Sequence, residues 1–169
     1  MTLFGCSFSF QSNQYSAIKG LLDREVNKGP QSNWLLTWSG YQIPMMAVLV
    51  ENETWFMAPK DVLVRFDGWQ ITEVNNLLPA NTSVRIQFAD KEMVIFEGRR
   101  NISSFTCKEW QKHKYELGIN HLQSCSRGNL VFDNSIWVNN NGSISKMAFK
   151  VHPNYPEVTL ELLNQYSLN

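Results

Sequence analysis

The sequence lacks net charge and long apolar runs. Its 15 basic and 15 acidic side chains cancel at pH 7, so no net electrostatic field draws the chain toward nucleic acid or an anionic membrane. The longest apolar stretch, from Pro44 to Val50, has the length of a strand and is much shorter than the roughly 18 residues of a membrane-spanning helix. We therefore expect a soluble protein without a membrane partner.

Cysteine is scarce as well. The three cysteines, Cys6, Cys107 and Cys125, are odd in number and spread along the chain. This argues against a disulfide framework and favours a reducing compartment, so we expect a cytoplasmic protein.

The first residues contain no basic segment followed by an apolar one, so no secretory signal is expected. Leu3-Phe4-Gly5-Cys6 is similar to the segment at which bacterial lipoproteins are cleaved, but only five residues precede the cysteine, too few for a signal unless the natural chain begins upstream of Met1. Large residues alternate with small ones from Phe4 to Phe10, which instead predicts a strand with one buried face.

Catalytic and cofactor motifs are also absent. The sequence contains no glycine-rich phosphate loop, HExxH zinc motif, nucleophile elbow or dinucleotide fingerprint. Catalytic groups are often separated in sequence, so an enzyme stays open as the less favoured interpretation. No cofactor is expected.

Aromatic residues, by contrast, are abundant. Six Trp, ten Phe and five Tyr occur in 169 residues, enough large apolar surface for a substantial core. A chain of this length can be stable as one domain without a disulfide or a metal. We expect residues 1–169 to form a single globular domain.

Strand and turn signals dominate the chain after residue 33. Runs rich in β-branched and aromatic residues predict strands over Trp34 to Ser39, Met45 to Val50, Thr54 to Ala58, Asp61 to Phe66, Val84 to Phe88 and Met93 to Phe96. Turn residues at Asp67-Gly68, at Asp90-Lys91 and from Asn139 to Gly142 predict hairpins, the first with a two-residue turn.

Helical signals are fewer. Apolar spacing predicts a helix over Gln14 to Lys28 and a short helical turn over Thr72 to Leu78. A capping box at Thr106 to Glu109 predicts a helix that continues to Leu117, and Pro156 fits the first turn of a C-terminal helix. The expected fold class is α+β: an antiparallel, strongly curled sheet, a meander of hairpins, with two or three helices packed against it.

One segment resembles a known family. Asp61 to Gly68, followed by Ile71-Thr72-Glu73-Val74 and Leu77-Leu78, is similar to the strand-turn-helix run of bacterial PDZ domains. The resemblance implies a peptide groove flanked by a long helix. Because Pro79 and Asn81 leave no room for that helix, we do not assign the family.

Cys107, His113, His121 and Cys125 form the sharpest candidate for chemistry. Two thiols and two imidazoles have the right donor atoms for tetrahedral zinc. Their spacing, Cys-x5-His-x7-His-x3-Cys, matches no zinc finger, so no metal is assigned. A metal-dependent or cysteine-based enzyme that uses the Cys107–Cys125 region is one alternative function.

The segment from Arg99 to Lys114 supports a second alternative. It mixes cations with aromatic residues, a combination that can bind single-stranded nucleic acid by phosphate contacts and base stacking. Three glutamates, Glu97, Glu109 and Glu116, lie within or beside it. A solvated face with ion pairs is therefore the favoured interpretation, and nucleic acid is not the expected partner.

The tryptophans support the favoured hypothesis. Trp34, Trp38, Trp55 and Trp69 lie in or beside the predicted strands, and tryptophan is enriched at binding hot spots. Core packing is the competing interpretation for these indoles. We expect a small, soluble bacterial accessory protein that binds a protein partner or a small apolar ligand through an aromatic-lined sheet surface, with a homodimer left open.

Overall fold

The computed structural model describes residues 33–77 and 82–163 of the chain. These residues belong to one compact unit, Ser32–Asn169, and the account below concerns that unit alone. The strand predicted over Phe4 to Phe10 and the helix predicted over Gln14 to Lys28 lie outside the described residues. The expectation of a single domain over residues 1–169 stays a prediction.

The described residues form thirteen strands and no helix. The strands are β1 (Trp34–Trp38), β2 (Tyr41–Val50), β3 (Glu53–Ala58), β4 (Val62–Phe66), β5 (Ile71–Leu77), β6 (Thr82–Ala89), β7 (Glu92–Glu97), β8 (Arg100–Cys107), β9 (Gln111–Tyr115), β10 (Gly118–Arg127), β11 (Leu130–Asn139), β12 (Ile144–Phe149) and β13 (Val158–Leu162). The predicted α+β class is therefore wrong, and this unit is all-β.

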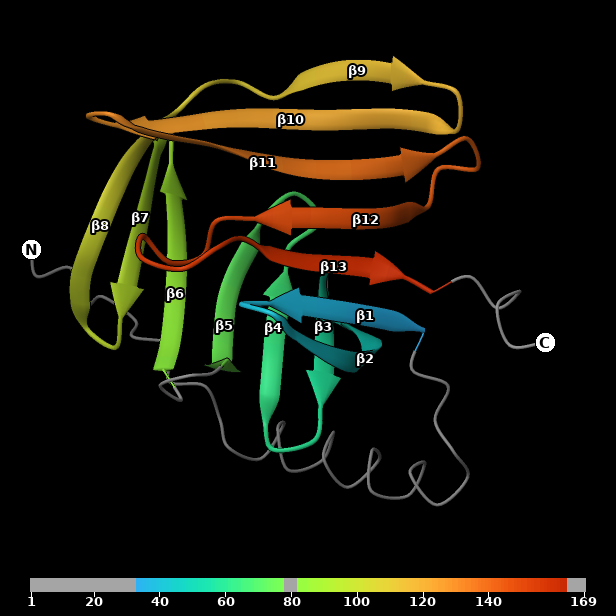
Figure 1. The fold of residues 1–169 in the computed structure, drawn as a ribbon, viewed down its shortest axis with the longest axis horizontal. Helices are drawn as coiled ribbons and strands as arrows, with labels where there is room; N and C mark the ends of the chain where they lie inside the picture. Colours follow the sequence, from blue (N-terminus) through green and yellow to red (C-terminus); the bar gives the residue numbers. More distant parts are fainter. Residues whose placement is uncertain (1–32, 78–81, 164–169) are drawn as a thin grey trace, which may run out of the picture. The chain divides into compact units, whose positions relative to one another are not determined.

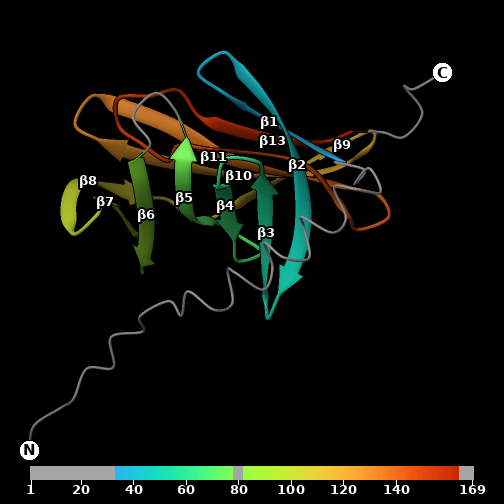
Figure 2. The ribbon, with the colours of Figure 1, turned by 90° about the horizontal axis from the view of Figure 1, so that it is seen from below.

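The strands close into a barrel. β1 to β8 form an antiparallel meander, and β10 to β13 form a second one. Pairing of β13 with β1 and of β8 with β10 joins the two meanders into a ring of twelve strands, which leaves β9 outside the ring and paired with β10. In both views β3 to β6 run across the direction of β10 to β13 (Figures 1 and 2), as in a strongly curled sheet.

The core lies on the inner face of the ring, and in several strands alternate side chains are buried there. Along β6, for example, Val84 and Ile86 are buried while Ser83, Arg85 and Gln87 are exposed. The largest fully buried side chains come from both meanders: Phe56, Phe105, Phe149, Leu36, Met45, Ile71, Met93, Ile95, Ile136, Met147, Leu160 and Val64. Closure thus buries one continuous apolar interior without any helix.

The three predicted hairpins are confirmed. Asp67-Gly68 lies between β4 and β5, Asp90-Lys91 between β6 and β7, and the asparagine-rich turn between β11 and β12. The first turn is longer than predicted, because the Asp67 N–H donates to the Gln70 carbonyl (3.1 Å) across a four-residue turn.

The helix predicted over Thr106 to Leu117 is wrong. The first backbone N–H groups of a helix have no partner within the helix. Here the Cys107 N–H donates to the Lys91 carbonyl (2.7 Å) and the Lys108 N–H to the Ser124 carbonyl (2.8 Å). Pairing with strands distant in sequence therefore overrides the capping box, and the segment becomes the end of β8 and all of β9.

The predicted helical turn over Thr72 to Leu78 is also wrong, because its described residues, Thr72 to Leu77, lie in β5. Ile71, Val74 and Leu77 are buried at every third position, a spacing that imitates a helix. It arises from a register shift between Val74 and Leu77, where Asn76 has a φ of 55°.

The C-terminal helix predicted from Pro156 is wrong as well. Val158 and Leu160 are fully buried in β13, and Thr159 between them is only partly buried. This alternation is that of a strand. Five residues are too few for the apolar pattern alone to separate the two periods.

Candidate functional site

An aromatic cluster joins residues from four separate parts of the chain. Trp69 comes from the β4–β5 turn, Trp110 precedes β9, His121 lies in β10 and Phe149 ends β12. The ring centroids lie 5.9 Å apart for Trp69–Trp110, 5.2 Å for Trp69–His121 and 6.3 Å for Trp110–Phe149. We call these four residues the Trp69 cluster.

The cluster runs from the core to solvent. Phe149 is buried and its ring lies 6.2 Å from that of Phe66 inside the barrel. Trp110 is half-buried, and Trp69 keeps 50% of its surface exposed. Because the indole of Trp69 is half-exposed and packs against other rings, it offers apolar surface to a ligand, and the side chain does not need to move out of the core.

The β4–β5 turn holds Trp69 in place. The carboxylate of Asp67 accepts hydrogen bonds from the N–H groups of Trp69 and Gln70, both at 2.8 Å. Gly68 has a φ of 103°, which a residue with a side chain rarely adopts. The turn therefore has a defined conformation, and Trp69 lies against His121 at a steep angle of 76°.

His121 is the polar member of the cluster. Its side chain is 8% exposed, and within the described part of the chain its Nδ1 has no hydrogen-bond partner. Burial, and then the positive charge of Lys112, lowers the pKa of His121 below its usual value, so the imidazole is neutral at pH 7. Nδ1 is itself buried, so it is a polar atom without a partner inside the protein and does not face solvent.

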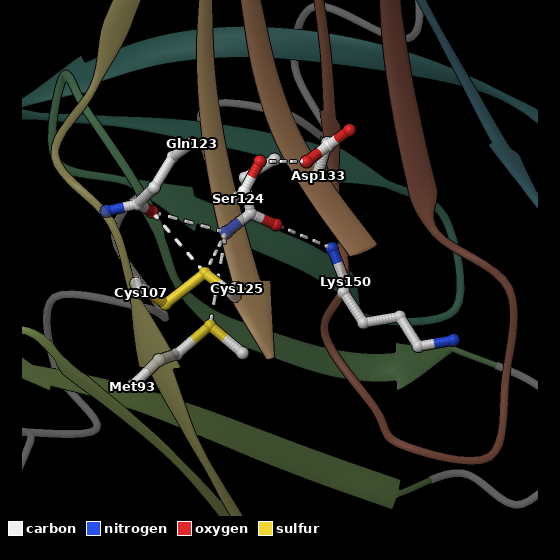
Figure 3. Close-up of a disulfide and its surroundings, with 8 residues drawn as sticks. Met93, Cys107, Gln123, Ser124, Cys125, Asp133 and Lys150 are labelled. Carbon is white, nitrogen blue, oxygen red and sulfur yellow. Dashed lines mark hydrogen bonds between the residues drawn. A yellow bond between two sulfur atoms is a disulfide. The ribbon is translucent and has the colours of Figure 1, made fainter. Parts of the chain in front are cut away.

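A disulfide lies at the base of the segment that carries Trp110 and His121. Cys107 in β8 and Cys125 in β10 are bonded to each other, and both are buried. Figure 3 shows this disulfide beside Met93 and Gln123. The interpretation of the cysteines as unpaired is therefore wrong for these two, because strand pairing brings positions far apart in sequence to adjacent places in the sheet.

The polar groups around the disulfide are structural. The fully buried amide of Asn134 donates to Gln123 Oε1 (3.4 Å) and accepts from the Lys150 N–H (3.0 Å). The Cys125 sulfur lies 3.9 Å from Gln123 Oε1, but a disulfide sulfur has no hydrogen to donate. Satisfied amides of this kind fix the position of the strands and leave no group free for chemistry.

The four residues proposed as zinc ligands do not assemble. Cys107 and Cys125 are consumed by the disulfide. In the β9–β10 pair, His113 lies opposite Asn120 and His121 opposite Lys112, so the two histidines point to opposite faces. No group of three metal-ligating side chains occurs among the described residues, and neither cysteine offers a free thiolate for a cysteine-based enzyme.

The four predicted binding tryptophans do not share one surface. Trp34 and Trp38 are buried in the core, 8% and 4% exposed. Trp55 is buried away from that core cluster, and its ring lies 5.3 Å from the Arg65 guanidinium. Trp69 alone of the four is largely exposed. Their role in binding stays a prediction, and only Trp69 can meet a ligand without rearrangement of the barrel.

The basic segment from Arg99 to Lys114 is divided by the fold. Its two arginines lie at the β7–β8 turn, and its lysines at the far end of β8 and in β9. Phe105 is buried in the core and cannot stack on a base. The geometry brings together no continuous row of cations and exposed rings.

The sequence does not predict that Trp110 and Phe149 meet Trp69. Trp110 is one of the aromatic residues of the Arg99–Lys114 segment, in a stretch whose predicted helix is wrong, and Phe149 carries no signal beyond its apolar character. Their meeting with Trp69 depends on closure of the barrel, which no local motif encodes.

Comparisons with known proteins establish the fold and little more. No protein-family model matches the sequence, and no curated protein matches it. The crystal structure of the hypothetical lipoprotein YmcC from Escherichia coli (K12) is similar, with a TM-score of 0.55 and 10% sequence identity over 94% of this chain and 97% of that one. At that identity the likeness concerns the fold alone.

Within residues 33–77 and 82–163, no helix has the length and hydropathy to cross a bilayer.

Proposed function

We propose that the protein binds a small apolar ligand with a flat or aromatic group at the Trp69 cluster. The observation that carries this proposal is the half-exposed Trp69, supported by Trp110 and set against the edge of His121. Burial of an aromatic ligand face against two indoles gives a large apolar contact at little conformational cost.

A barrel scaffold suits such a role. The Trp69 cluster draws its residues from both meanders, so closure holds the rings at fixed distances before a ligand arrives. Preorganised rings reduce the entropy lost on binding. The similar solved structure belongs to a protein named as a hypothetical lipoprotein, and this name assigns no ligand to either chain.

A location outside the reducing cytoplasm is part of the proposal. The Cys107–Cys125 disulfide supports it, because structural disulfides persist mainly in oxidising compartments. The expected cytoplasmic location is untested. Alkylation of thiols in intact cells of the native host distinguishes the two locations. Protection of Cys107 and Cys125 from the reagent supports export, and their labelling supports a cytoplasmic location.

Titration with 1-anilinonaphthalene-8-sulfonate, a flat apolar probe, tests the site. We expect saturable binding to the unaltered chain and at least about tenfold weaker binding to Trp69→Ala, since a buried aromatic contact contributes more than about 1.4 kcal/mol. Tyr41→Ala is the matched control, because Tyr41 is 54% exposed and lies in β2. Equal affinity of all three proteins would overturn the proposal.

A further inference from the structure

One strand edge in the described residues has no partner strand. Each of the other twelve strands has a partner strand on both sides, although β8 pairs with β10 only through Thr106 and Cys107, whereas β9 pairs with β10 alone. β10 divides one of its edges, pairing Gly118 to Leu122 with β9 and Cys125 to Ser126 with β8. Figure 1 shows β9 at the margin of the sheet, with no labelled strand beyond it. An edge of this kind presents free backbone N–H and C=O groups to another chain.

The edge is short, exposed and basic. All five side chains of β9 are exposed. Lys112 and Lys114 point to one face, and no acidic residue lies between Gln111 and Tyr115. The preceding acidic residue, Glu109, is 3.8 Å from the ammonium of Lys91. Glu116 directly follows the strand, but no ion pair among the described residues involves Lys112 or Lys114. The strand therefore presents two positive charges on one face and His113 and Tyr115 on the other.

A second copy of this chain fits the edge badly. Antiparallel pairing centred on His113 would place Lys112 of each copy directly opposite Lys114 of the other. Like charges at opposite positions of two paired strands are destabilising. Lysines at an exposed edge also protect a protein against self-pairing, so the same residues that exclude a copy leave the edge open to a strand of opposite charge.

We propose that the β9 edge binds an extended segment of a partner protein that has acidic residues at alternate positions. The segment adds as a strand, with backbone hydrogen bonds to β9 and its acidic side chains facing Lys112 and Lys114. Side chains at the intervening positions contact His113 and Tyr115. This inference does not depend on the ligand site at Trp69.

The edge is held in place for such an addition. The N-terminal side of β9 is fixed by the Cys107–Cys125 disulfide and by the Lys108 N–H, which donates to the Ser124 carbonyl (2.8 Å). Its C-terminal side continues through the turn into Gly118, which pairs with Tyr115. A preformed edge spares the partner the entropy of ordering β9 on binding.

A fluorescence-anisotropy titration of the full chain with a labelled peptide of alternating glutamate and threonine tests the proposal. We expect binding that weakens as salt is raised, with backbone amide shifts confined to β9 and its neighbours in nitrogen-15 NMR spectra. The double variant Lys112→Glu/Lys114→Glu should bind the peptide at least about tenfold more weakly, because two cross-strand attractions become repulsions. The same variant should bind the lysine–threonine counterpart instead.

Arg99→Glu/Arg100→Glu is the matched control, since it changes the net charge equally at exposed positions on the β7–β8 turn. It should bind the acidic peptide as the unaltered chain does. Three results would overturn the proposal: no binding of the acidic peptide at low salt, equal loss in both double variants, or a dimer in solution that pairs through β9. Circular dichroism of both variants verifies that each is folded.

Discussion

The β1–β8 meander and the seam between β8 and β10 are joined in different ways. Neighbouring strands of the meander follow one another in sequence. The β6–β7 hairpin, for example, contains six register pairs. The seam has two pairs, Cys125 with Cys107 and Ser126 with Thr106, and a disulfide across the first. Local hairpins thus build most of the barrel, whereas two junctions between strands distant in sequence close it: the four pairs of β1 with β13, and the seam with its two pairs and its disulfide.

The comparison also explains where the candidate sites lie. Trp110, His121 and the open edge of β9 all belong to the segment enclosed by the disulfide. Within this segment β9 has a partner strand on one side only, so its outer backbone groups can meet another molecule.

The largest effect is expected at Gly118, the first residue of β10. A Cβ atom built there would lie 1.9 Å from the Val138 carbonyl oxygen, so Gly118→Ala should lower the free energy of unfolding by about 3 kcal/mol. Gly98 is the matched control in the meander, because nothing lies within 4 Å of its Cβ position. Its φ of 59° limits the cost of Gly98→Ala to about 1 kcal/mol. Chemical denaturation that gives equal losses for the two variants would refute the tight contact between Gly118 in β10 and Val138 in β11.

The disulfide should contribute nearly as much. Cys107→Ala/Cys125→Ala opens a loop between residues 18 apart, which costs about 3 kcal/mol by loop-closure entropy. Thermal unfolding with and without a reductant measures this directly. Reduction should destabilise the unaltered chain and leave the double variant unchanged. If reductant did not change the stability of the unaltered chain, strand pairing without the disulfide would be enough to hold β8 against β10.

Within the meander, ion pairing on the outer surface should have a smaller effect. Arg65 donates to Glu53 at 2.7 Å and to Glu73 at 2.8 Å, and these side chains are about three-quarters buried. Arg65→Met leaves two carboxylates without their cation and should cost about 1 to 2 kcal/mol. Lys146→Met removes the more exposed pair with Glu161 at 3.7 Å and should cost less than about 0.5 kcal/mol. If urea denaturation showed a larger loss of stability for Lys146→Met than for Arg65→Met, the more buried ion pairs would not be the stronger ones.

The smallest effect concerns pH. Burial lowers the pKa of His121, with Lys112 contributing, and burial also lowers the pKa of His152. For each histidine the unfolded chain then takes up a proton before the folded one as the pH falls. Stability should be highest above pH 6.5, the ordinary histidine value, and should decline as the pH falls through the folded-state pKa values.

His121→Gln should reduce that decline and leave the part caused by His152. Unfolding curves measured between neutral and mildly acidic pH test this expectation. An unchanged slope in the variant would mean that His121 is not desolvated in the folded protein.

Turn chemistry made the meander predictable. Asp67-Gly68 and Asp90-Lys91 each marked a hairpin because their residue types suit the turn conformations. Local signals gave the wrong secondary structure where pairing with strands distant in sequence determines the conformation. The capping box at Thr106 to Glu109 describes a real preference of four residues, yet pairing of Cys107 with Cys125 outweighs it.

The bulged strand β5 shows a second limit. Ile71, Val74 and Leu77 repeat every third residue because of a register shift, and a strand with such a shift has the apolar spacing of a helical turn. Trp69 was chosen from the sequence for its place beside a turn, which the structure keeps. Its neighbours Trp110 and His121 could not be chosen with it, since only barrel closure makes them neighbours.

The most direct test of the ligand site is a nitrogen-15 NMR titration that follows the indole N–H signals of the six tryptophans during addition of 1-anilinonaphthalene-8-sulfonate. We predict that the signals of Trp69 and Trp110 shift, while those of Trp34, Trp38 and Trp55, which are buried, stay in place. Shifts confined to other indoles, or no shift at all at saturating probe, would contradict a binding site at the Trp69 cluster.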